Sequence, residues 1–118
     1  MTARLDHVQV AIPAGEEDLA RAFYGKLLGL SEIPKPPELE RSGGCWFALG
    51  ASQLHVGADP DFRPAKKAHV AIAVDDLAAF RAVVEAAGHP VLPDIPLGNR
   101  ERFFTEDKHG NRVEIVAA

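Results

Sequence analysis

The stretch "KAHVAIAVDD" at residues 67–76 repeats a pattern that stands near the start of the chain as "LDHVQVAIPA", residues 5–14. In each stretch a histidine, His7 or His69, opens a run of β-branched and small apolar residues, which is typical of a β-strand. The two histidines lie 62 positions apart (69 − 7 = 62). This repetition predicts that the chain contains two copies of one structural unit.

The rest of each copy follows the same order of elements. An acidic start followed by apolar residues at helical spacing predicts a helix over about 16–28 and another over about 76–87. The apolar stripe of the first is expected to be Leu19, Phe23 and Leu27. The proline-rich stretches that follow predict loops with at most a short edge strand, and a hairpin ends each half. We therefore predict an α+β fold, a single domain over residues 1–118 built from two βαβββ modules, 1–58 and 66–118.

The repeat can be extended beyond the histidines. Setting His7 on His69 and pairing the closing hairpins places Phe47 with Phe104 and His55 with Glu114. This pairing needs a two-residue insertion in the later hairpin, because 55 − 47 is 8 and 114 − 104 is 10. The alignment predicts that each of four strands carries one ionisable residue at an equivalent position.

Strand geometry predicts where these four residues point. Side chains alternate between the faces of a strand, so the bulky aliphatic residues take the core face and His7, His55, His69 and Glu114 take the other. A lone histidine on a strand is usually structural, but three imidazoles and one carboxylate together suit a divalent first-row metal such as Zn, Ni, Fe or Mn. Three protein ligands plus water already complete a catalytic site, so a role for His55 outside the ligand set stays open.

Composition excludes several classes of function. A net charge of −4 with scattered Lys and Arg gives no basic face for nucleic acid, and no apolar run is long enough to span a membrane. The single cysteine, Cys45, forms no internal disulfide, and no signal-peptide pattern stands at the N-terminus, so a cytoplasmic location is expected. With no paired base in sequence, Cys45 is expected to be a buried apolar residue and not a nucleophile.

Two arginines, Arg100 and Arg102, precede the last hairpin. Either could bind a substrate carboxylate, but the position favours an exposed, charged strand edge.

At "LDHVQVAI", "FYGKLLGL", "AHVAIAVDDLAAF" and "DKHGNRVEIV" the sequence resembles the vicinal oxygen chelate superfamily. That superfamily includes glyoxalase I, extradiol dioxygenases, methylmalonyl-CoA epimerase and the fosfomycin- and bleomycin-resistance proteins. The resemblance implies paired βαβββ modules whose mixed sheet curls into a U shape around a cavity, and a homodimer in solution. It implies metal ligands at four positions, which here are His7, His55, His69 and Glu114.

The chain departs from the family pattern at three places. His55 stands where isomerase-like members more often have Glu or Gln, and Lys108 and His109 replace the usual start of the last loop. Gln9 stands where the fosfomycin-modifying members are expected to have a hydroxyl residue, so thiol transfer to fosfomycin is disfavoured.

The resemblance implies a small-molecule substrate that binds the metal through two neighbouring oxygens. The expected activity is that of a glyoxalase-like lyase or isomerase, with Glu114 or His55 as the base that removes a proton next to a carbonyl. The first alternative is a ring-cleaving dioxygenase with non-haem Fe(II) held by His7, His69 and Glu114. The second alternative is a metal-free protein that sequesters a drug in an aromatic cavity, which the presence of all four ligand-type residues disfavours.

Overall fold

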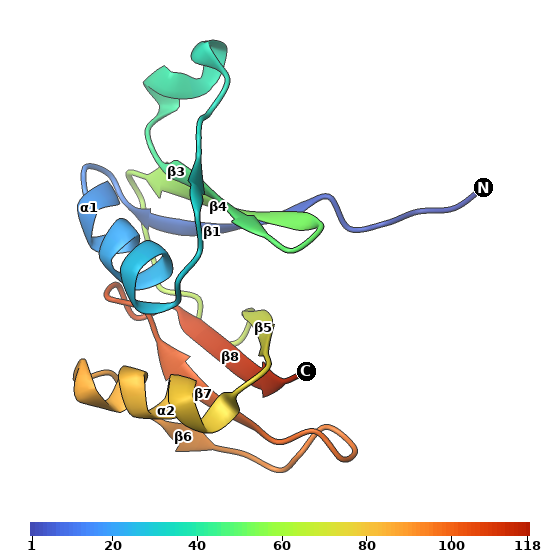
Figure 1. Ribbon diagram of the computed structural model, residues 1–118. Helices are drawn as coiled ribbons and strands as arrows, with labels where there is room; N and C mark the ends of the chain where they lie inside the picture. Colours follow the sequence, from blue (N-terminus) through green and yellow to red (C-terminus); the bar gives the residue numbers. More distant parts are fainter. The chain divides into compact units, whose positions relative to one another are not determined.

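The computed structural model describes residues 1–118 and divides them into two compact units, Met1–Arg63 and Pro64–Ala118. Each unit has one four-stranded mixed sheet with helical segments beside it (Figure 1). The predicted α+β class and the two βαβββ modules are thereby confirmed. That the modules form a single domain, curled around a shared cavity, stays a prediction.

The first unit has the strand order β1-β4-β3-β2, in which β1 and β4 are parallel and the other neighbours antiparallel. Parallel pairing of β1 with β4 places the start of the module beside its closing strand. Its elements are β1 (His7–Pro13), α1 (Glu17–Ala20), η1 (Arg21–Leu27), β2 (Glu32–Ile33), η2 (Pro37–Ser42), β3 (Cys45–Leu49) and β4 (Ser52–Asp59).

The first helix differs from the prediction in its winding. After one α-helical turn the chain continues as the π-helix η1, and the Leu28 amide donates to the carbonyl of Phe23, five residues back, at 2.9 Å. The wider turn brings Phe23 and Tyr24 together into the core, whereas Leu19, which was expected in the apolar stripe, is 43% exposed. The prediction for Leu19 is therefore wrong, because the buried stripe of the helix runs through Ala20, Phe23, Tyr24 and Leu28.

The second unit repeats this arrangement with the order β5-β8-β7-β6, again with the first pair parallel. Its helix begins after Asp76, whose side chain accepts a hydrogen bond from the Ala79 amide at 3.0 Å and so caps the helix. Its elements are β5 (Val70–Val74), α2 (Leu77–Ala86), β6 (Leu92–Pro93), β7 (Arg102–Glu106) and β8 (Arg112–Ala117).

The strand registers fix which residues of the two units are equivalent. Gln9 pairs with His55 and Ala71 with Glu114, so His7 corresponds to His69 and His55 to Glu114, as predicted. Across the hairpins, however, Trp46 pairs with His55 while Phe104 pairs with Glu114. The partner of Phe104 is therefore Trp46 and not Phe47, and the later hairpin has one extra residue (55 − 46 = 9; 114 − 104 = 10).

The core of each unit lies on the aliphatic face of its sheet, under the helix. In the first unit Phe47 and Leu54 are fully buried with Phe23 and Tyr24 of η1. In the second, Val113 and Ile115 are fully buried and Val84 of α2 packs on the same side. The residues that alternate with these along each strand lie on the opposite face of the sheet, here called the ligand face, as strand geometry predicted.

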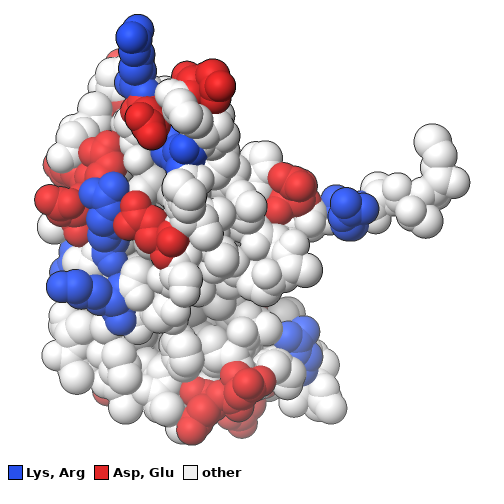
Figure 2. Space-filling view, turned by 45° about the horizontal axis from the view of Figure 1, so that its top comes forward, with Lys and Arg blue, Asp and Glu red and all other residues white.

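Charged side chains of both signs are interspersed on the face seen in Figure 2, in keeping with a net charge of −4. None of the helices has the length and apolar character required to cross a bilayer.

Candidate metal centre

The first unit brings His7 and His55 together through the parallel pairing of β1 and β4. Their rings stack with centroids 4.1 Å apart and planes inclined by 17°. Trp46, across the hairpin from His55, stacks on the other side of that ring at 3.8 Å. The result is a column of three aromatic rings, His7, His55 and Trp46, on the face opposite the core.

The second unit brings His69 and Glu114 together at the equivalent positions. Nε2 of His69 lies 2.8 Å from Oε1 of Glu114, and the glutamate is only 3% exposed. Phe104 contacts the edge of the His69 ring with centroids 5.1 Å apart. Here the corresponding face therefore carries a buried carboxylate where the first unit has an imidazole.

His7 and His69 share a feature that suits metal ligands. Nδ1 of His7 lies 2.8 Å from the carboxylate Oδ2 of Asp6, and Nδ1 of His69 lies 3.0 Å from the backbone carbonyl of Lys67. Both acceptors require the proton on Nδ1. In a neutral His7 this leaves the lone pair on Nε2, whereas Nε2 of His69 already faces Oε1 of Glu114 at 2.8 Å. Metal-binding histidines in proteins are held in this way by a carboxylate or a backbone carbonyl.

His55 differs from the other two histidines. Its Nε2 lies 2.8 Å from the side-chain Oε1 of Gln53, an acceptor that places the proton on Nε2. Burial, followed by the positive charge that His7 can carry, lowers the pKa of His55 below its ordinary value of 6.5. His55 is thus a neutral imidazole whose Nε2 already has a partner, and it binds a metal through this atom only if Gln53 moves.

The four candidate ligands are of types that bind a divalent cation, and each unit contributes two of them. Neither unit alone gathers three His, Cys, Asp or Glu side chains. The second unit supplies a further sign. Oε2 of Glu114 is buried and accepts no hydrogen bond, although Nη1 of Arg102 lies 3.3 Å away without hydrogen-bonding geometry. A buried carboxylate oxygen without a hydrogen bond is unfavourable, and a cation would satisfy it.

Cys45 has the properties expected from the sequence. It is 2% exposed, and burial raises the pKa of its thiol to about 11. A thiol with this pKa is protonated at neutral pH, so Cys45 does not act as a nucleophile.

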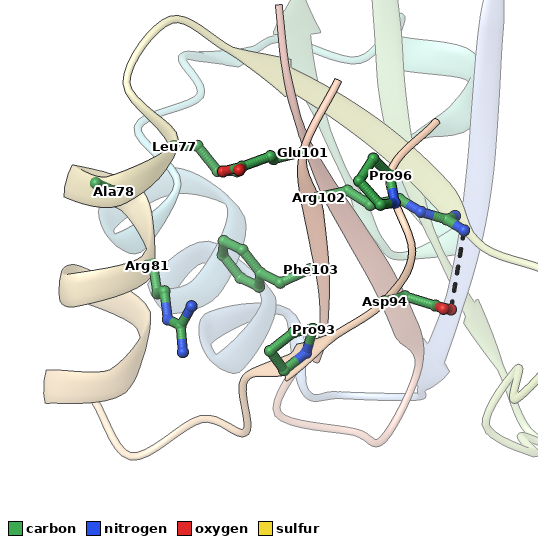
Figure 3. A pocket seen from close by; sticks show the side chains of 9 residues that line it. All are labelled: Leu77, Ala78, Arg81, Pro93, Asp94, Pro96, Glu101, Arg102 and Phe103. Atoms are coloured by element: carbon green, nitrogen blue, oxygen red, sulfur yellow. Dashed lines mark ion pairs between the residues drawn. The ribbon is translucent and has the colours of Figure 1, made fainter. Parts of the chain in front are cut away.

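Arg102 is the residue whose surroundings the sequence did not predict. Its side chain is 14% exposed and is not on an open edge. It lies on β7 two residues before Phe104 and therefore on the same face of the sheet, and Phe104 pairs with Glu114. The spacing of two residues between Arg102 and Phe104 was the signal that could have placed Arg102 on the ligand face. Arg102 is one of the residues that line a cavity of about 350 Å³, and Figure 3 shows its side chain extending toward Asp94.

The sequence pattern of the Glyoxalase/Bleomycin resistance protein/Dioxygenase superfamily matches residues 4–115, almost the whole chain. The chain belongs to this superfamily. The resemblance to the vicinal oxygen chelate proteins is thereby confirmed. The superfamily contains enzymes, including lactoylglutathione lyase, as well as resistance proteins.

Solved structures support the same assignment. The chain is 43% identical to a protein from Bacillus anthracis assigned to the glyoxalase family, with a TM-score of 0.94, covering 99% of this chain and 96% of that one. Two more distant structures show the shared superfamily fold alone. Lactoylglutathione lyase from Agrobacterium tumefaciens is 19% identical with a TM-score of 0.77, covering 100% of this chain and 96% of that one. A fosfomycin resistance protein from Listeria monocytogenes is 16% identical with a TM-score of 0.77, covering 100% and 95%. No curated protein matches the sequence.

Proposed function

We propose that the protein is a metal-dependent enzyme with glyoxalase-like lyase or isomerase activity. Its substrate is a small molecule that binds a divalent metal through two neighbouring oxygens. The observation that carries this proposal is that Nδ1 of both His7 and His69 is bound to an oxygen, as in metal-binding histidines, and that Nε2 of His69 lies 2.8 Å from the buried carboxylate of Glu114.

Four residues would hold the metal: His7, His55, His69 and Glu114. When bound, a divalent metal acts as a Lewis acid that stabilises negative charge on the substrate oxygens. The hydrogen bond from His55 to Gln53 supports a weaker role for His55 as ligand, or an acid–base role instead. Each unit offers two of these four donors.

Glu114 is the proposed base. It is buried, and its Oε2 accepts no hydrogen bond, although Nη1 of Arg102 lies 3.3 Å away. A carboxylate in this state can remove a proton next to a carbonyl when the substrate lies within hydrogen-bonding distance. His55, a neutral imidazole with a lowered pKa, is the second candidate for proton transfer.

Metal analysis tests this proposal directly. Protein purified without chelator is expected to retain a divalent metal after dialysis, and His69→Ala is expected to lose it. His89→Ala is the matched control, because Nδ1 of His89 contacts the carbonyl of Glu106 outside the candidate site. A wild-type protein without metal, or a His69→Ala variant that retains it, would contradict the proposal and favour the metal-free sequestering protein.

A ring-cleaving dioxygenase is the second candidate function. It is favoured by the hydrogen bond of His55 to Gln53, since without His55 the remaining donors are two histidines and one carboxylate, the set that holds non-haem Fe(II). Oxygen uptake by the Fe(II)-loaded protein with catechol tests this function. Exchange of the α-proton of a 2-hydroxy carbonyl compound in D₂O, without oxygen uptake, supports the lyase or isomerase.

We further propose that the protein is a cytoplasmic homodimer. The free, buried thiol of Cys45 suits a reducing compartment, and a dimer would allow half-sites of two copies to combine. Light scattering during size-exclusion chromatography measures the oligomeric state, and a monomer that binds metal fully would restrict the site to one chain.

A further inference from the structure

Arg102 is held on the ligand face of the second unit by three oxygens. Its Nε donates to the backbone carbonyl of Ile95 at 2.9 Å, which fixes the direction of the side chain. Nη1 lies 3.3 Å from Oε2 of Glu114, and Nη2 lies 3.8 Å from Oδ2 of Asp94. The terminal edge of the guanidinium, which binds carboxylates in pairs of hydrogen bonds, therefore faces the proposed metal ligand.

A second guanidinium lies on the same face. Arg112 lies two residues before Glu114 on β8 and so on the same face of the sheet. Its Cζ lies 3.7 Å from the centroid of the Phe104 ring. The guanidinium of Arg102 lies 5.1 Å from the centroid of the same ring. Arg112 forms no ion pair, so its charge adds to that of Arg102.

The charge balance of this face changes when a cation binds. A divalent cation on Glu114 neutralises the carboxylate that now faces Nη1 of Arg102. Arg102 then keeps only Asp94, at the long distance of 3.8 Å. A metal with two guanidinium groups beside it leaves an excess of positive charge, which an anionic substrate would compensate.

We infer that Arg102 binds a carboxylate of the substrate, and that the substrate is a small 2-oxo or 2-hydroxy carboxylic acid. This inference rests on the proposed function, because the neighbouring oxygens of such an acid would be those that bind the metal. The present partners of the Nη atoms, Glu114 and Asp94, are both carboxylates, so a substrate carboxylate replaces a group of the same shape and charge.

Space for such a molecule adjoins this edge. A cavity of about 180 Å³ is lined by Phe104, Arg112 and Asp94, the ion-pair partner of Arg102, while Arg102 and Glu114 lie beyond its lining. This volume accommodates an organic acid of a few carbon atoms and not a large conjugate.

Two probes that differ only in charge test the inference. Pyruvate and hydroxyacetone both offer neighbouring oxygens, but only pyruvate carries a carboxylate. Binding to Co²⁺-loaded protein is measured by calorimetry and by the visible absorption of the cobalt. In Arg102→Gln, pyruvate affinity is expected to fall about 10- to 100-fold, the usual loss for a hydrogen-bonded pair of charges. Hydroxyacetone affinity is expected to stay within about 2-fold. Co²⁺ affinity is expected not to fall, since the variant removes a positive charge that lies 3.3 Å from Oε2 of the proposed metal ligand Glu114.

Two further variants complete the design. Arg102→Lys keeps the charge but loses the planar fork, so an intermediate loss of pyruvate affinity is expected, and this variant replaces Arg102→Gln if that protein fails to fold. Arg100→Gln is the matched control: Arg100 lies two residues away, is exposed, and donates through Nε to the carbonyl of Ala117 at 2.8 Å. It is expected to bind both probes like wild type.

The possible failures are distinguishable. A wild-type protein that binds no Co²⁺ overturns the proposed function, and this inference with it. If the wild-type protein binds Co²⁺ but Arg102→Gln lowers the affinity for pyruvate and hydroxyacetone equally, or lowers neither affinity, only the role of Arg102 is overturned.

Discussion

The two units deliver different chemistry from the same backbone positions. In the first, the position on the closing strand carries His55, stacked between His7 and Trp46. In the second, the equivalent position carries Glu114, which faces His69 and Arg102. One face is therefore an aromatic column, and the other is a network of charges. Because a divalent cation needs negative charge nearby, we expect the second unit to dominate binding.

The largest expected difference is in folding stability, at the equivalent residues Phe104 and Trp46. Phe104 is 4% exposed beneath Arg112, whereas Trp46 is partly exposed. We expect Phe104→Ala to lower the free energy of unfolding by about 3–4 kcal/mol. For Trp46→Ala we expect about 1–2 kcal/mol, mainly from the lost stacking on His55. Urea unfolding of both variants measures the two values, and equal losses would remove the difference in packing between the two faces.

Substitutions at the equivalent positions Glu114 and His55 are expected to change the metal affinity by different amounts. Glu114→Gln keeps the size of the side chain but removes its charge, and we expect the metal dissociation constant to rise about 100-fold, or about 2.7 kcal/mol. His55→Gln is expected to raise it about 10-fold or less, since Nε2 of His55 already donates to Gln53. Competition with a coloured chelator measures both constants. If His55→Gln has the larger effect, the ranking of the two units is reversed.

A smaller contrast involves glycine. In the first unit the Gln9 side chain lies over Gly57, and a Cβ on Gly57 would meet Nε2 of Gln9 at 2.6 Å. The second unit has Ala71 and Val116 at the corresponding positions, so the large and small residues are exchanged.

We expect Gly57→Ala alone to cost about 1 kcal/mol, because it displaces Gln9 from the sheet. In a Gln9→Ala background the same change should be neutral or stabilise by about 0.5 kcal/mol, since alanine restricts the unfolded chain. A double-mutant cycle on thermal unfolding measures the coupling. Additive effects would show that Gln9 does not occupy the space above Gly57.

The smallest expected effect is a pH dependence in the metal-free protein. Since burial lowers the pKa of His55 in the folded state, the unfolded chain binds this proton more readily below about pH 6.5. Folding stability should thus fall as the pH drops from about 7 through the folded pKa of His55, and His55→Gln should lose less over this range. Urea midpoints at several pH values give the difference between the two proteins. If the urea midpoints of the two proteins change with pH in parallel, the pH dependence comes from a group other than His55.

Much of the ligand face was predictable because it depends on local rules. The alternation of side chains in the strands placed His7, His69 and Glu114 opposite the aliphatic residues, and the parallel registers agree with that placement. The equivalence of His55 and Glu114 followed from the repeat alone. That the four residues bind one metal stays a prediction.

Other features depend on information that a sequence pattern does not carry. The match of Phe104 to Trp46 was missed because a hairpin insertion can be one or two residues long without changing the strand pattern. The π-helix η1 was missed because its apolar residues also fit α-helical spacing. The contact between Arg102 and Glu114 required the cross-strand register of β7 and β8, which no single segment specifies.

Each β-ladder is completed by strands of its own half, and the two sheets share no strand. A change in loop length or register in one half therefore leaves every ladder hydrogen bond of the other intact. The imidazole of His55 in one half and the carboxylate of Glu114 in the other therefore need no compensating change in the ladder of the opposite half. The junction at Arg63 and Pro64 is accordingly the natural crossover point for chimeras that combine halves of different relatives.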